Sequence, residues 1–402
     1  MPVHLRELLG KPGGVKEENR LSLLRALMIN PDNQTNLSKR ARLSTGTVSG
    51  AVEELVGQGV ITSARIGRET FVRMAKTAGL VVGIEGGRQT ATVVARRVDQ
   101  DYQDSAARQV RVGVGRGLQM WVPAVVQAVR EVVDELEQDD VVAVGLGVPW
   151  MIDPQDGTLV PPALPPWKEG DDPAGQLADG LREELGAQFM APKVVLDNDA
   201  NLLAYAESIY GTPSGETLIG IKASTGIGAG IIIGGNIFRG MCGVAGELGH
   251  TSLQADGRFC VCGGRGCLET LVGADVLVEQ AKVALGNQRK LAPANFDELV
   301  AAAVHGNLTC QRVLYEAART LGVALGNLCN VLNPNVVVLG GTLGQDEAAL
   351  YTLDACKEGI SRTAMRAAIA EQSGFTVRTR QVRYAASHGA VAMALQGTVY
   401  QT

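Results

Sequence analysis

Three apolar stretches of this chain run into closely spaced glycines, and this repeated pattern restricts the folds that the chain can adopt. The stretches are LVVGIEGGRQTATVVARRV at 80–98, TLIGIKASTGIGAGIIIGG at 217–235 and NPNVVVLGGTLG at 333–344. The first two are typical of a strand, a glycine turn and a second strand, and the third is typical of a strand that ends at a glycine pair. Abundant glycine (50 residues) and few aromatic residues (4%) favour an α/β fold with many tight turns.

Length and composition describe a globular chain of two or three domains. The chain has 402 residues, of which 46% are apolar and 20% are charged. No apolar run approaches the length of about 18 residues that a membrane helix needs, and the N-terminal segment lacks an apolar signal core, so we expect a cytoplasmic protein. Among the seven cysteines, three cluster, which indicates metal binding rather than a disulfide scaffold. The other four, which fit packing roles, are Cys242, Cys310, Cys329 and Cys356.

Charge is distributed unevenly along the chain. Residues 1–76 contain twelve Lys and Arg residues against seven Asp and Glu residues, whereas the rest of the chain contains 25 against 35. A basic N-terminal segment on an acidic body suggests that only the N-terminal segment meets a polyanion. Charge alone leaves open the alternative of an ordinary solvated surface.

The N-terminal segment has the pattern of three short helices, expected over 17–30, 34–42 and 45–58. In each helix, apolar residues recur on one face at helical spacing. These residues are Leu21, Leu24, Leu27 and Met28 in the first helix, Leu37 and Ala41 in the second, and Val48, Val52, Leu55 and Val56 in the third. A short turn at 43–44 separates the last two helices, as in a helix-turn-helix, and Ser44 is a favoured N-cap residue.

The third helix begins with small polar residues, as the leading end of a DNA recognition helix does. These residues are Ser44, Thr45, Thr47 and Ser49. Their hydroxyl groups, together with the amide groups of a helix N-terminus, are able to reach phosphates and base edges. Two short strands around residues 67–68 then predict a wing, with Arg65 and Arg68 at its tip for a minor groove or the DNA backbone. The segment is therefore interpreted as a winged helix-turn-helix that binds DNA, with a small helical dimerisation module as the alternative.

The glycine turns and one long motif together resemble a known family. Three glycine-marked strand ends in two halves look like the actin-like fold of sugar kinases and ATPases, in which two α/β halves clasp a nucleotide between hairpin turns. The stretch GVAGELGHTSLQADGRFCVCGGRGCLET at 243–270 closely resembles the signature and zinc motif of the ROK family, which groups repressors, uncharacterised reading frames and sugar kinases. With the N-terminal helix-turn-helix ahead of a body match over 80–397, the chain resembles a ROK-type transcriptional regulator.

The resemblance implies an organisation and a function. The expected fold class is α/β with an N-terminal α+β head, that is, a winged helix-turn-helix over 1–76 followed by a two-lobed actin-like, sugar-kinase-like body. The first lobe is expected over 79–198, completed by a C-terminal helix over 387–402, and the second lobe, with the zinc loop and the effector site, over 199–386. The implied function is that of a repressor whose affinity for double-stranded operator DNA is controlled by a sugar or sugar derivative bound between the lobes. A homodimer or a dimer of dimers is the expected assembly.

The first glycine turn departs from the pattern of the family's kinases, which hold phosphate there with an Asp, two Gly and a Thr. This chain has Glu85 in place of the Asp, Arg88 in place of the second Gly and Gln89 in place of the Thr. A phosphate cradle needs close approach of the backbone, which glycine permits and an arginine side chain obstructs. We therefore expect no ATP and no enzyme activity. A sugar kinase that keeps a DNA-binding head is the alternative, because Asp199 and the second glycine turn at 224–228 are retained and because arginine also binds phosphate.

The resemblance further implies the residues that contact the sugar. They are Asn198, Asp199, Glu247, His250 and Glu269. Carboxylates and an imidazole suit a polyol, because they form hydrogen bonds with hydroxyl groups. Asp199 matches the general base of the kinases and is here a vestigial catalytic candidate, with helix N-capping as its structural alternative. Two departures leave the sugar open: Ala163 stands where the family commonly has Asn, and Trp150 follows the proline of a loop that usually reads Pro-Gly.

Three cysteines and a histidine predict a structural zinc site. The ligands are His250, Cys260, Cys262 and Cys267, and glycines between the cysteines allow a tight loop around one ion. Three thiolates and one imidazole fill the tetrahedral shell of Zn²⁺ and leave no open position for hydrolytic chemistry. Zinc is expected to fix His250, whose other ring nitrogen faces the sugar, and so to support the effector site from behind. A redox disulfide and a zinc-responsive repressor are the alternatives.

Overall fold

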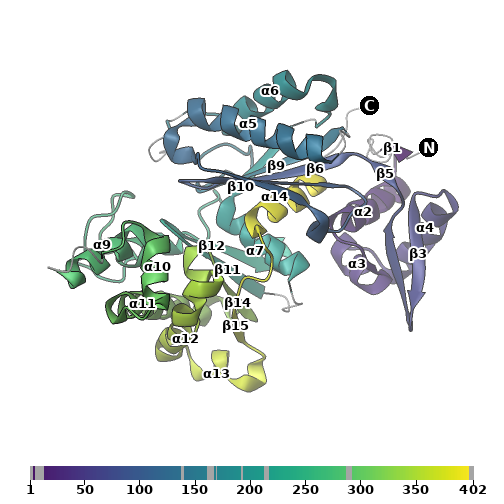
Figure 1. The fold of residues 1–402 in the computed structure, drawn as a ribbon. Helices are drawn as coiled ribbons and strands as arrows, with labels where there is room; N and C mark the ends of the chain where they lie inside the picture. Colours follow the sequence, from purple (N-terminus) through teal and green to yellow (C-terminus); the bar gives the residue numbers. More distant parts are fainter. Residues whose placement is uncertain are drawn as a thin grey trace. The chain divides into compact units, whose positions relative to one another are not determined.

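Figure 1 shows the computed structural model of the chain as a ribbon. The structure describes residues 3–4, 13–136, 140–160, 167–168, 170–191, 193–211, 217–286 and 292–397, and every structural statement below concerns these residues. The chain divides into two compact units. The first unit comprises Met1–Trp150, Asp156–Asn198 and Ala386–Thr402, and the second comprises Met151–Gln155 and Asp199–Ala385.

The first unit begins with the head, which consists of three helices and a small sheet. The helices are α2 (Val15–Ile29), α3 (Gln34–Ala41) and α4 (Thr45–Gly57). The antiparallel sheet has the order β2-β4-β3, with the strands β2 (Asp32–Asn33), β3 (Ile61–Ile66) and β4 (Glu69–Met74). A parallel pair joins β1 (Val3–His4) to β5 (Thr77–Ala78).

Side-chain caps set the starts of the two helices of the helix-turn-helix. The Asn33 side chain accepts a hydrogen bond from the Asn36 amide at the start of α3, and the Ser44 hydroxyl accepts one from the Thr47 amide at the start of α4. Arg42 adopts a left-handed conformation with a φ of 57° and ends α3 one residue before the expected boundary. The turn between the helices therefore spans 42–44 and is one residue longer than the sequence indicated.

Burial in α4 follows helical spacing with one exception. Val48, Val52 and Leu55 are buried, as expected, but Val56 is 39% exposed. Residues four and seven positions after Val48 stay on its face, whereas the eighth lies at the edge of that face and meets solvent. The expectation that Val56 joins the apolar face is therefore wrong.

After the head, the first unit contains a five-stranded sheet with the order β10-β9-β6-β7-β8. Its strands are β6 (Leu80–Gly86), β7 (Ala91–Arg97), β8 (Ala106–Val110), β9 (Val141–Val148) and β10 (Val194–Asn198). Neighbours are antiparallel from β6 to β8 and parallel from β6 through β9 to β10. The helices α5 (Leu118–Glu135) and α6 (Pro173–Leu185) cover one face of this sheet, and α14 (Ala385–Gly397) lies on the other face (Figure 1).

Two glycines allow α14 to approach the sheet closely. A Cβ atom on Gly83 in β6 would lie 2.0 Å from the carbonyl oxygen of Ser387, and one on Gly145 in β9 would lie 2.1 Å from that of Ala390. No side chain fits at these contacts, so the strands need glycine there. The Ser387 hydroxyl also donates a hydrogen bond of 3.1 Å to the Thr92 carbonyl in β7. The C-terminal helix therefore packs on this sheet.

The second unit contains another five-stranded sheet, with the order β13-β12-β11-β14-β15. Its strands are β11 (Thr217–Ala223), β12 (Ile227–Ile233), β13 (Asn236–Ile237), β14 (Val336–Gly340) and β15 (Thr376–Thr379). The helix α7 (Asp199–Tyr210) packs on one face, where Gly220 and Gly230 meet Ala204.

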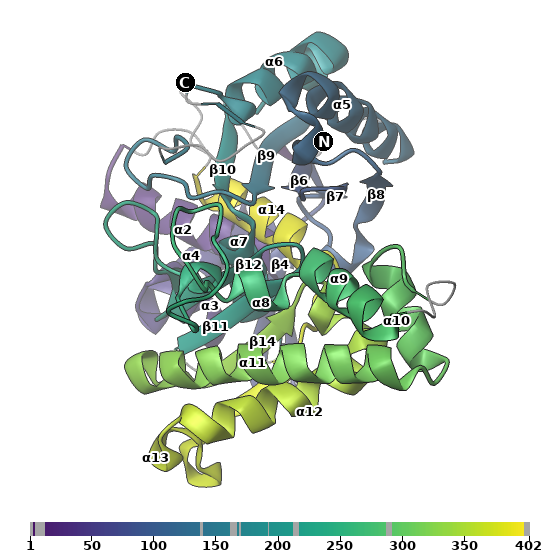
Figure 2. The ribbon, with the colours of Figure 1, turned by 90° about the vertical axis from the view of Figure 1, so that its left-hand side faces the viewer.

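The other face of this sheet carries the apolar core of the second unit. The core is built with the helices α9 (Ala274–Leu285), α10 (Phe296–Val304), α11 (Leu308–Leu332) and α12 (Asp346–Thr363). Figure 2 shows α12 running along α11. The short helices α8 (Glu269–Val272) and α13 (Arg366–Ile369) complete the helices of this unit that the structure describes.

A buried carboxylate ties α7 to the segment that leads into α14. Glu207 is fully buried and forms an ion pair with Arg378 at 2.5 Å. The same carboxylate accepts hydrogen bonds of 2.8 Å from the amides of Gln381 and Val382. Breaking these contacts would leave a buried charge without partners, so the end of α7 and this segment are held as one piece.

The architecture agrees with the fold class expected from the sequence, an α/β body that follows an α+β head. The border between the two units crosses the chain on either side of Met151–Gln155, between Asn198 and Asp199, and between Ala385 and Ala386. A search of the described residues finds no helix whose length and apolar character would let it cross a membrane.

Candidate ligand and metal sites

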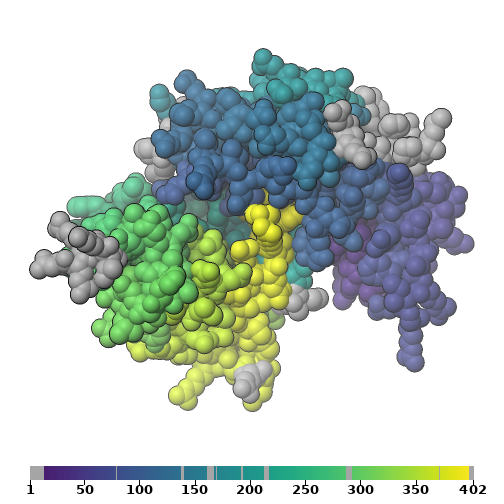
Figure 3. All heavy atoms as spheres, in the orientation of Figure 1, coloured from purple at the N-terminus to yellow at the C-terminus, as the bar shows by residue number. Residues whose placement is uncertain are grey.

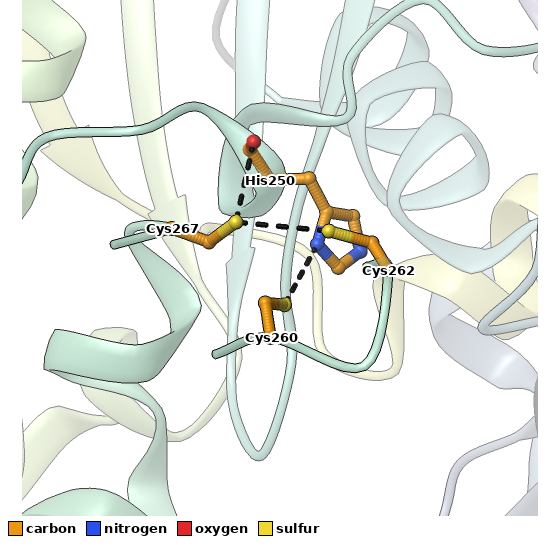
Figure 4. A group of neighbouring side chains, drawn as sticks. All are labelled: His250, Cys260, Cys262 and Cys267. Atoms are coloured by element: carbon orange, nitrogen blue, oxygen red, sulfur yellow. Dashed lines mark hydrogen bonds between the residues drawn. The ribbon is translucent and has the colours of Figure 1, made fainter. Parts of the chain in front are cut away.

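Four potential metal ligands lie together in the second unit (Figure 4). His250 ends the 3-10 turn η4 (Leu248–His250), and Cys260, Cys262 and Cys267 belong to the loop that follows. Their donor atoms all lie within 4.8 Å of one another. Nδ1 of His250 lies 3.4 Å from Sγ of Cys260, and the Sγ atoms of Cys262 and Cys267 lie 3.7 Å apart. The fold thus brings together the four ligands predicted from the sequence.

Glycines shape the loop that carries the cysteines. Gly263 and Gly266 have φ values of 87° and 63°, a region that side chains other than glycine rarely adopt. A Cβ atom on Gly266 would also lie 1.6 Å from the Gln254 carbonyl oxygen. The glycines therefore let the chain turn tightly enough to aim three thiols at one point.

The geometry and the chemistry of the four donors both fit a closed tetrahedral site. Ligands placed about 2.0–2.3 Å from a zinc ion at tetrahedral angles lie about 3.5–3.8 Å apart, close to the distances observed here. Burial, with hydrogen bonds from the neighbouring thiols, raises the pKa of Cys267 to about 12. A bound cation supplies the positive charge that converts such a thiol into a thiolate ligand.

A cluster of three carboxylates lies beside the metal ligands. Asp199 begins α7, Glu247 directly precedes η4, and Glu269 begins α8. Burial, followed by the charges of Asp199 and Glu269, raises the pKa of Glu247 to about 7. At neutral pH the Glu247 carboxyl group is therefore partly protonated, so it is able both to donate and to accept hydrogen bonds.

The imidazole of His250 stands between the two groups of side chains. Its Nδ1 atom faces Cys260, and its Nε2 atom lies 3.7 Å from Oε2 of Glu247. A metal ion bound through Nδ1 would fix the ring and leave Nε2 turned toward the carboxylates. Glu269 is held in turn by the amide of Ile227, which donates a hydrogen bond of 3.3 Å to Oε2. The carboxylate cluster is thus positioned by contacts to His250, beside the loop that carries the cysteines, and to the second glycine turn.

Lys222, which no motif marked, forms a buried ion pair inside this cluster. Its Nζ atom lies 2.5 Å from Oδ2 of Asp199, and the two side chains are only 13% and 6% exposed. The sequence did carry a signal for this contact. Alternation along β11 places Lys222 on the same face as Gly220, which contacts α7, and α7 begins at Asp199.

The candidate ligand residues of the first unit have structural partners. Asn198 ends β10, and its Nδ2 atom donates a hydrogen bond of 3.1 Å to the Trp150 carbonyl. Trp150 is buried and stacks on Trp167 with a centroid distance of 4.4 Å and an interplanar angle of 6°. Trp150 therefore fills space against a second indole. Ala163, the other departure from the family pattern, lies outside the described residues.

The first glycine turn, between β6 and β7, is held by its own neighbours. The amides of Val114 and Gly115 donate hydrogen bonds of 3.0 Å to the carbonyls of Gly87 and Arg88. No residue of this turn is among those of the described chain that have a positive φ. The backbone therefore accommodates an arginine at position 88 without conformational strain.

The candidate DNA-contacting residues occupy accessible positions on the head. Ser44, Thr45 and Ser49 are exposed at the start of α4, and Thr47 is half-buried, with its hydroxyl hydrogen-bonded to that of Ser44. Arg65 and Arg68 are exposed on the hairpin of β3 and β4, which projects from the head (Figures 1 and 3).

Comparisons with known proteins connect the chain to one family. The model of the ROK family matches residues 81–397. A xylose repressor of Caldicellulosiruptor bescii is 27% identical over 81% of this chain and 83% of its own length. A glucokinase of Streptomyces coelicolor is 30% identical over 71% of this chain and 88% of its own length.

A solved structure is similar over nearly the whole chain. It is the crystal structure of a ROK family transcriptional regulator, homologous to the E. coli MLC protein, with a TM-score of 0.70 and 18% identity. The alignment covers 94% of this chain and 96% of that one, so the shared fold includes the head. Because the ROK family model matches most of its length, the chain belongs to the ROK family.

Proposed function

We propose that the chain is a transcriptional repressor that binds operator DNA through its head and releases it in response to a sugar. The observation that carries this proposal is the joining of a winged helix-turn-helix, with exposed polar and basic residues, to a ROK body that holds a cluster of three carboxyl groups beside an imidazole. The similarity to a xylose repressor over 81% of the chain supports the same function. In this proposal the head spans 1–76. The first lobe spans 79–198 and is completed by 387–402, and the second lobe spans 199–386.

The proposed effector is a neutral polyol bound by Asp199, Glu247, His250 and Glu269, with Asn198 as a further contact. Three carboxyl groups accept hydrogen bonds from several hydroxyls, and the partly protonated Glu247 also donates one. A sugar that lacks one of these hydroxyls leaves a polar group of the site unpaired, which gives the site its selectivity. An acidic sugar is disfavoured, because its charge would meet a cluster of carboxylates.

We further propose that the body has no kinase activity. A general base must take a proton from the sugar hydroxyl and become neutral in doing so. If Asp199 became neutral, Lys222 would be left as a buried ammonium group without its counter-charge, which is strongly unfavourable. Arg88 in the first glycine turn adds a side chain where a kinase brings its backbone close to phosphate. Both features support a site that binds sugar without turning it over.

A zinc ion held by His250, Cys260, Cys262 and Cys267 is proposed as a structural part of the effector site. The ion would supply the charge that keeps the three thiols ionised and would hold the loop in place. The imidazole then presents Nε2 to the carboxylate cluster in one orientation. Zinc in this role acts on ligand affinity through geometry and takes no part in a reaction.

DNA recognition is proposed to involve a homodimer on a two-fold operator. The start of α4, with Ser44, Thr45, Thr47 and Ser49, would enter the major groove, and Arg65 and Arg68 would contact the minor groove or the backbone. Two heads on one duplex require half-sites at a defined helical spacing. A sugar then changes operator affinity by binding one arrangement of the dimer more tightly than the other.

The proposal is tested by DNA binding of the full-length protein with zinc. An operator is first selected from random duplexes, and its affinity is then measured by fluorescence anisotropy with D-xylose, D-glucose, N-acetyl-D-glucosamine and their phosphates. One neutral sugar is expected to weaken DNA binding by about tenfold or more, a coupling of about 1.4 kcal/mol. Glu247→Gln should abolish this response and leave sugar-free DNA binding within about twofold.

A matched control and a rival outcome complete the test. Glu279→Gln alters an exposed carboxylate on α9 and should leave the sugar response intact. Failure to select any DNA sequence would refute the repressor. ATP-dependent phosphorylation of a sugar that disappears in Asp199→Asn would instead establish the kinase, the activity named for the glucokinase relative.

A further inference from the structure

The C-terminal end of α2, the first helix of the head, has no basic residue of its own. The last carbonyl groups of a helix have no partner within it and carry partial negative charge. Arg40 of α3 satisfies part of this end from within the head, where it donates hydrogen bonds to the Ala26 and Asn30 carbonyls. The carbonyls of Met28 and Ile29, which lie between them, accept hydrogen bonds from outside the head.

Arg96, at the end of β7, provides this outside contact. Its Nη2 atom donates hydrogen bonds to the carbonyls of Met28 at 2.6 Å and Ile29 at 3.3 Å. Its Nη1 atom donates to the carbonyls of Arg97 at 3.0 Å and Gln100 at 2.9 Å, which anchor the guanidinium on its own strand. Arg96 is only 1% exposed, so water is unable to replace the carbonyls of α2.

Residues next to Arg96 contact β5, the strand through which the chain passes from the head to the sheet. Thr77 in β5 is fully buried, its amide donates a hydrogen bond of 2.9 Å to Asp99, and its carbonyl accepts one of 3.0 Å from Arg97. Residues 96–101 thus contact the head at the end of α2 and at the connecting strand. We call this segment the head socket.

The head socket is backed by α14, the helix that packs on the same sheet. His388 of α14 is 5% exposed, and its ring packs edge-on against Tyr102 at a centroid distance of 5.4 Å. Burial and the charge of Arg96 lower the pKa of His388 to about 4, which keeps the ring neutral beside the guanidinium. The chain entering α14 is tied to α7 through Glu207, and α7 begins at the effector residue Asp199.

We propose that Arg96 is a positioning residue that fixes the orientation of the DNA-binding head on the body. The inference rests on the proposed function and adds the contact by which the body controls the head. Rigidly held heads let a dimer read the spacing between two half-sites, whereas loosely held heads bind each half-site independently. Arg96 therefore contributes to binding of a complete operator and contributes little to binding of a single half-site.

The test compares two duplexes and three variants of the full-length protein. One duplex carries the selected two-fold operator, and the other carries one half-site in unrelated flanking sequence. Arg96→Met removes all donors, and Arg96→Lys keeps the charge but loses the planar fork that bridges two carbonyls. Arg108→Met is the control, because Arg108 lies on β8 of the same sheet and forms exposed ion pairs with Glu131 and Glu135.

Arg96→Met should weaken binding to the two-site operator by about tenfold or more and binding to the half-site by less than about threefold. Arg96→Lys should fall between Arg96→Met and wild type, and Arg108→Met should match wild type. An equal loss of affinity for both duplexes would show that Arg96 only stabilises the fold of the head. No loss of affinity for either duplex would show that Arg96 does not position the head. Either result would overturn the inference. If thermal melting shows Arg96→Met to be unfolded, Arg96→Lys decides by the same ratio. A wild-type protein that binds neither duplex refutes the proposed function itself.

Discussion

Replacing Lys222 by Met should destabilise the second unit by about 3–5 kcal/mol, the range found when one partner of a buried ion pair is removed. Methionine keeps an apolar side chain of similar length, so the loss reports on the missing charge. The Asp199 carboxylate is only 6% exposed, and it shares its site with Glu247 and Glu269. Water therefore compensates little, and the neighbouring carboxylates add repulsion. Lys282→Met is the control, since Lys282 forms an exposed pair with Glu279 and should contribute less than about 0.5 kcal/mol.

A double-mutant cycle separates the ion pair from other effects of the substitution. Asp199→Asn removes the carboxylate charge, and the double variant Lys222→Met with Asp199→Asn should be more stable than the sum of the single changes by about 2 kcal/mol or more. Hydrogen exchange at amides of β11 and α7 measures the free energy of local opening around this ion pair. Global unfolding of a chain with two units would not resolve this local free energy.

Additive effects in this cycle, with a coupling below about 0.5 kcal/mol, would refute the reasoning. Such a result would mean that Asp199 does not depend on Lys222. The argument that a locked carboxylate is unable to serve as a general base would then fail, and kinase assays would have to decide the function alone.

Three further predictions concern other parts of the chain. Arg68→Ala should weaken operator binding by about tenfold and lower the salt dependence of that binding by about one phosphate contact, with unchanged sugar affinity. Anisotropy titrations at several salt concentrations measure the operator affinity and its salt dependence. An equal loss of sugar affinity would show that the wing has a structural role. Cys262→Ser should reduce bound zinc, measured by metal analysis, together with the sugar response. An unchanged sugar response would show that the cysteine loop does not shape the sugar site. The buried His388 has a folded-state pKa of about 4, below its ordinary value of 6.5, so the unfolded chain binds the proton more readily. Stability should therefore fall by about 3 kcal/mol as the pH drops from about 6.5 to about 4, and His388→Gln should flatten that slope in thermal melts; an unchanged slope would contradict the assignment.

Local patterns predicted the elements and the groups that lie close in sequence. Ser44 caps α4 through Thr47, three residues away, because helix capping depends only on neighbouring backbone groups. The three cysteines of the candidate metal site all lie between positions 260 and 267, and glycines between them suffice to bring them together. The edges of elements were less predictable: Val56 is exposed because its burial depends on what packs against α4.

Contacts between distant residues were decided by the tertiary structure. Lys222 and Asp199 are 23 positions apart, and their pairing required the face of β11 and the start of α7 to be known. Arg96 meets the Met28 carbonyl 68 positions earlier in the chain, where no residue type marks the contact because the acceptor is backbone. Trp150 departs from the family pattern, and only the tertiary structure shows that it stacks on Trp167.

The sequence by itself indicated the family, the α/β architecture with its head, and the four side chains that lie close enough to hold one metal ion. These properties were predicted from the spacing of residue types along the chain. That spacing is local and does not depend on where a segment lies in the fold. The tertiary structure alone decided which charge neutralises Asp199 and which side chain holds the end of α2. Both answers depend on burial, since a charged group excluded from water must be paired by whatever the fold places beside it.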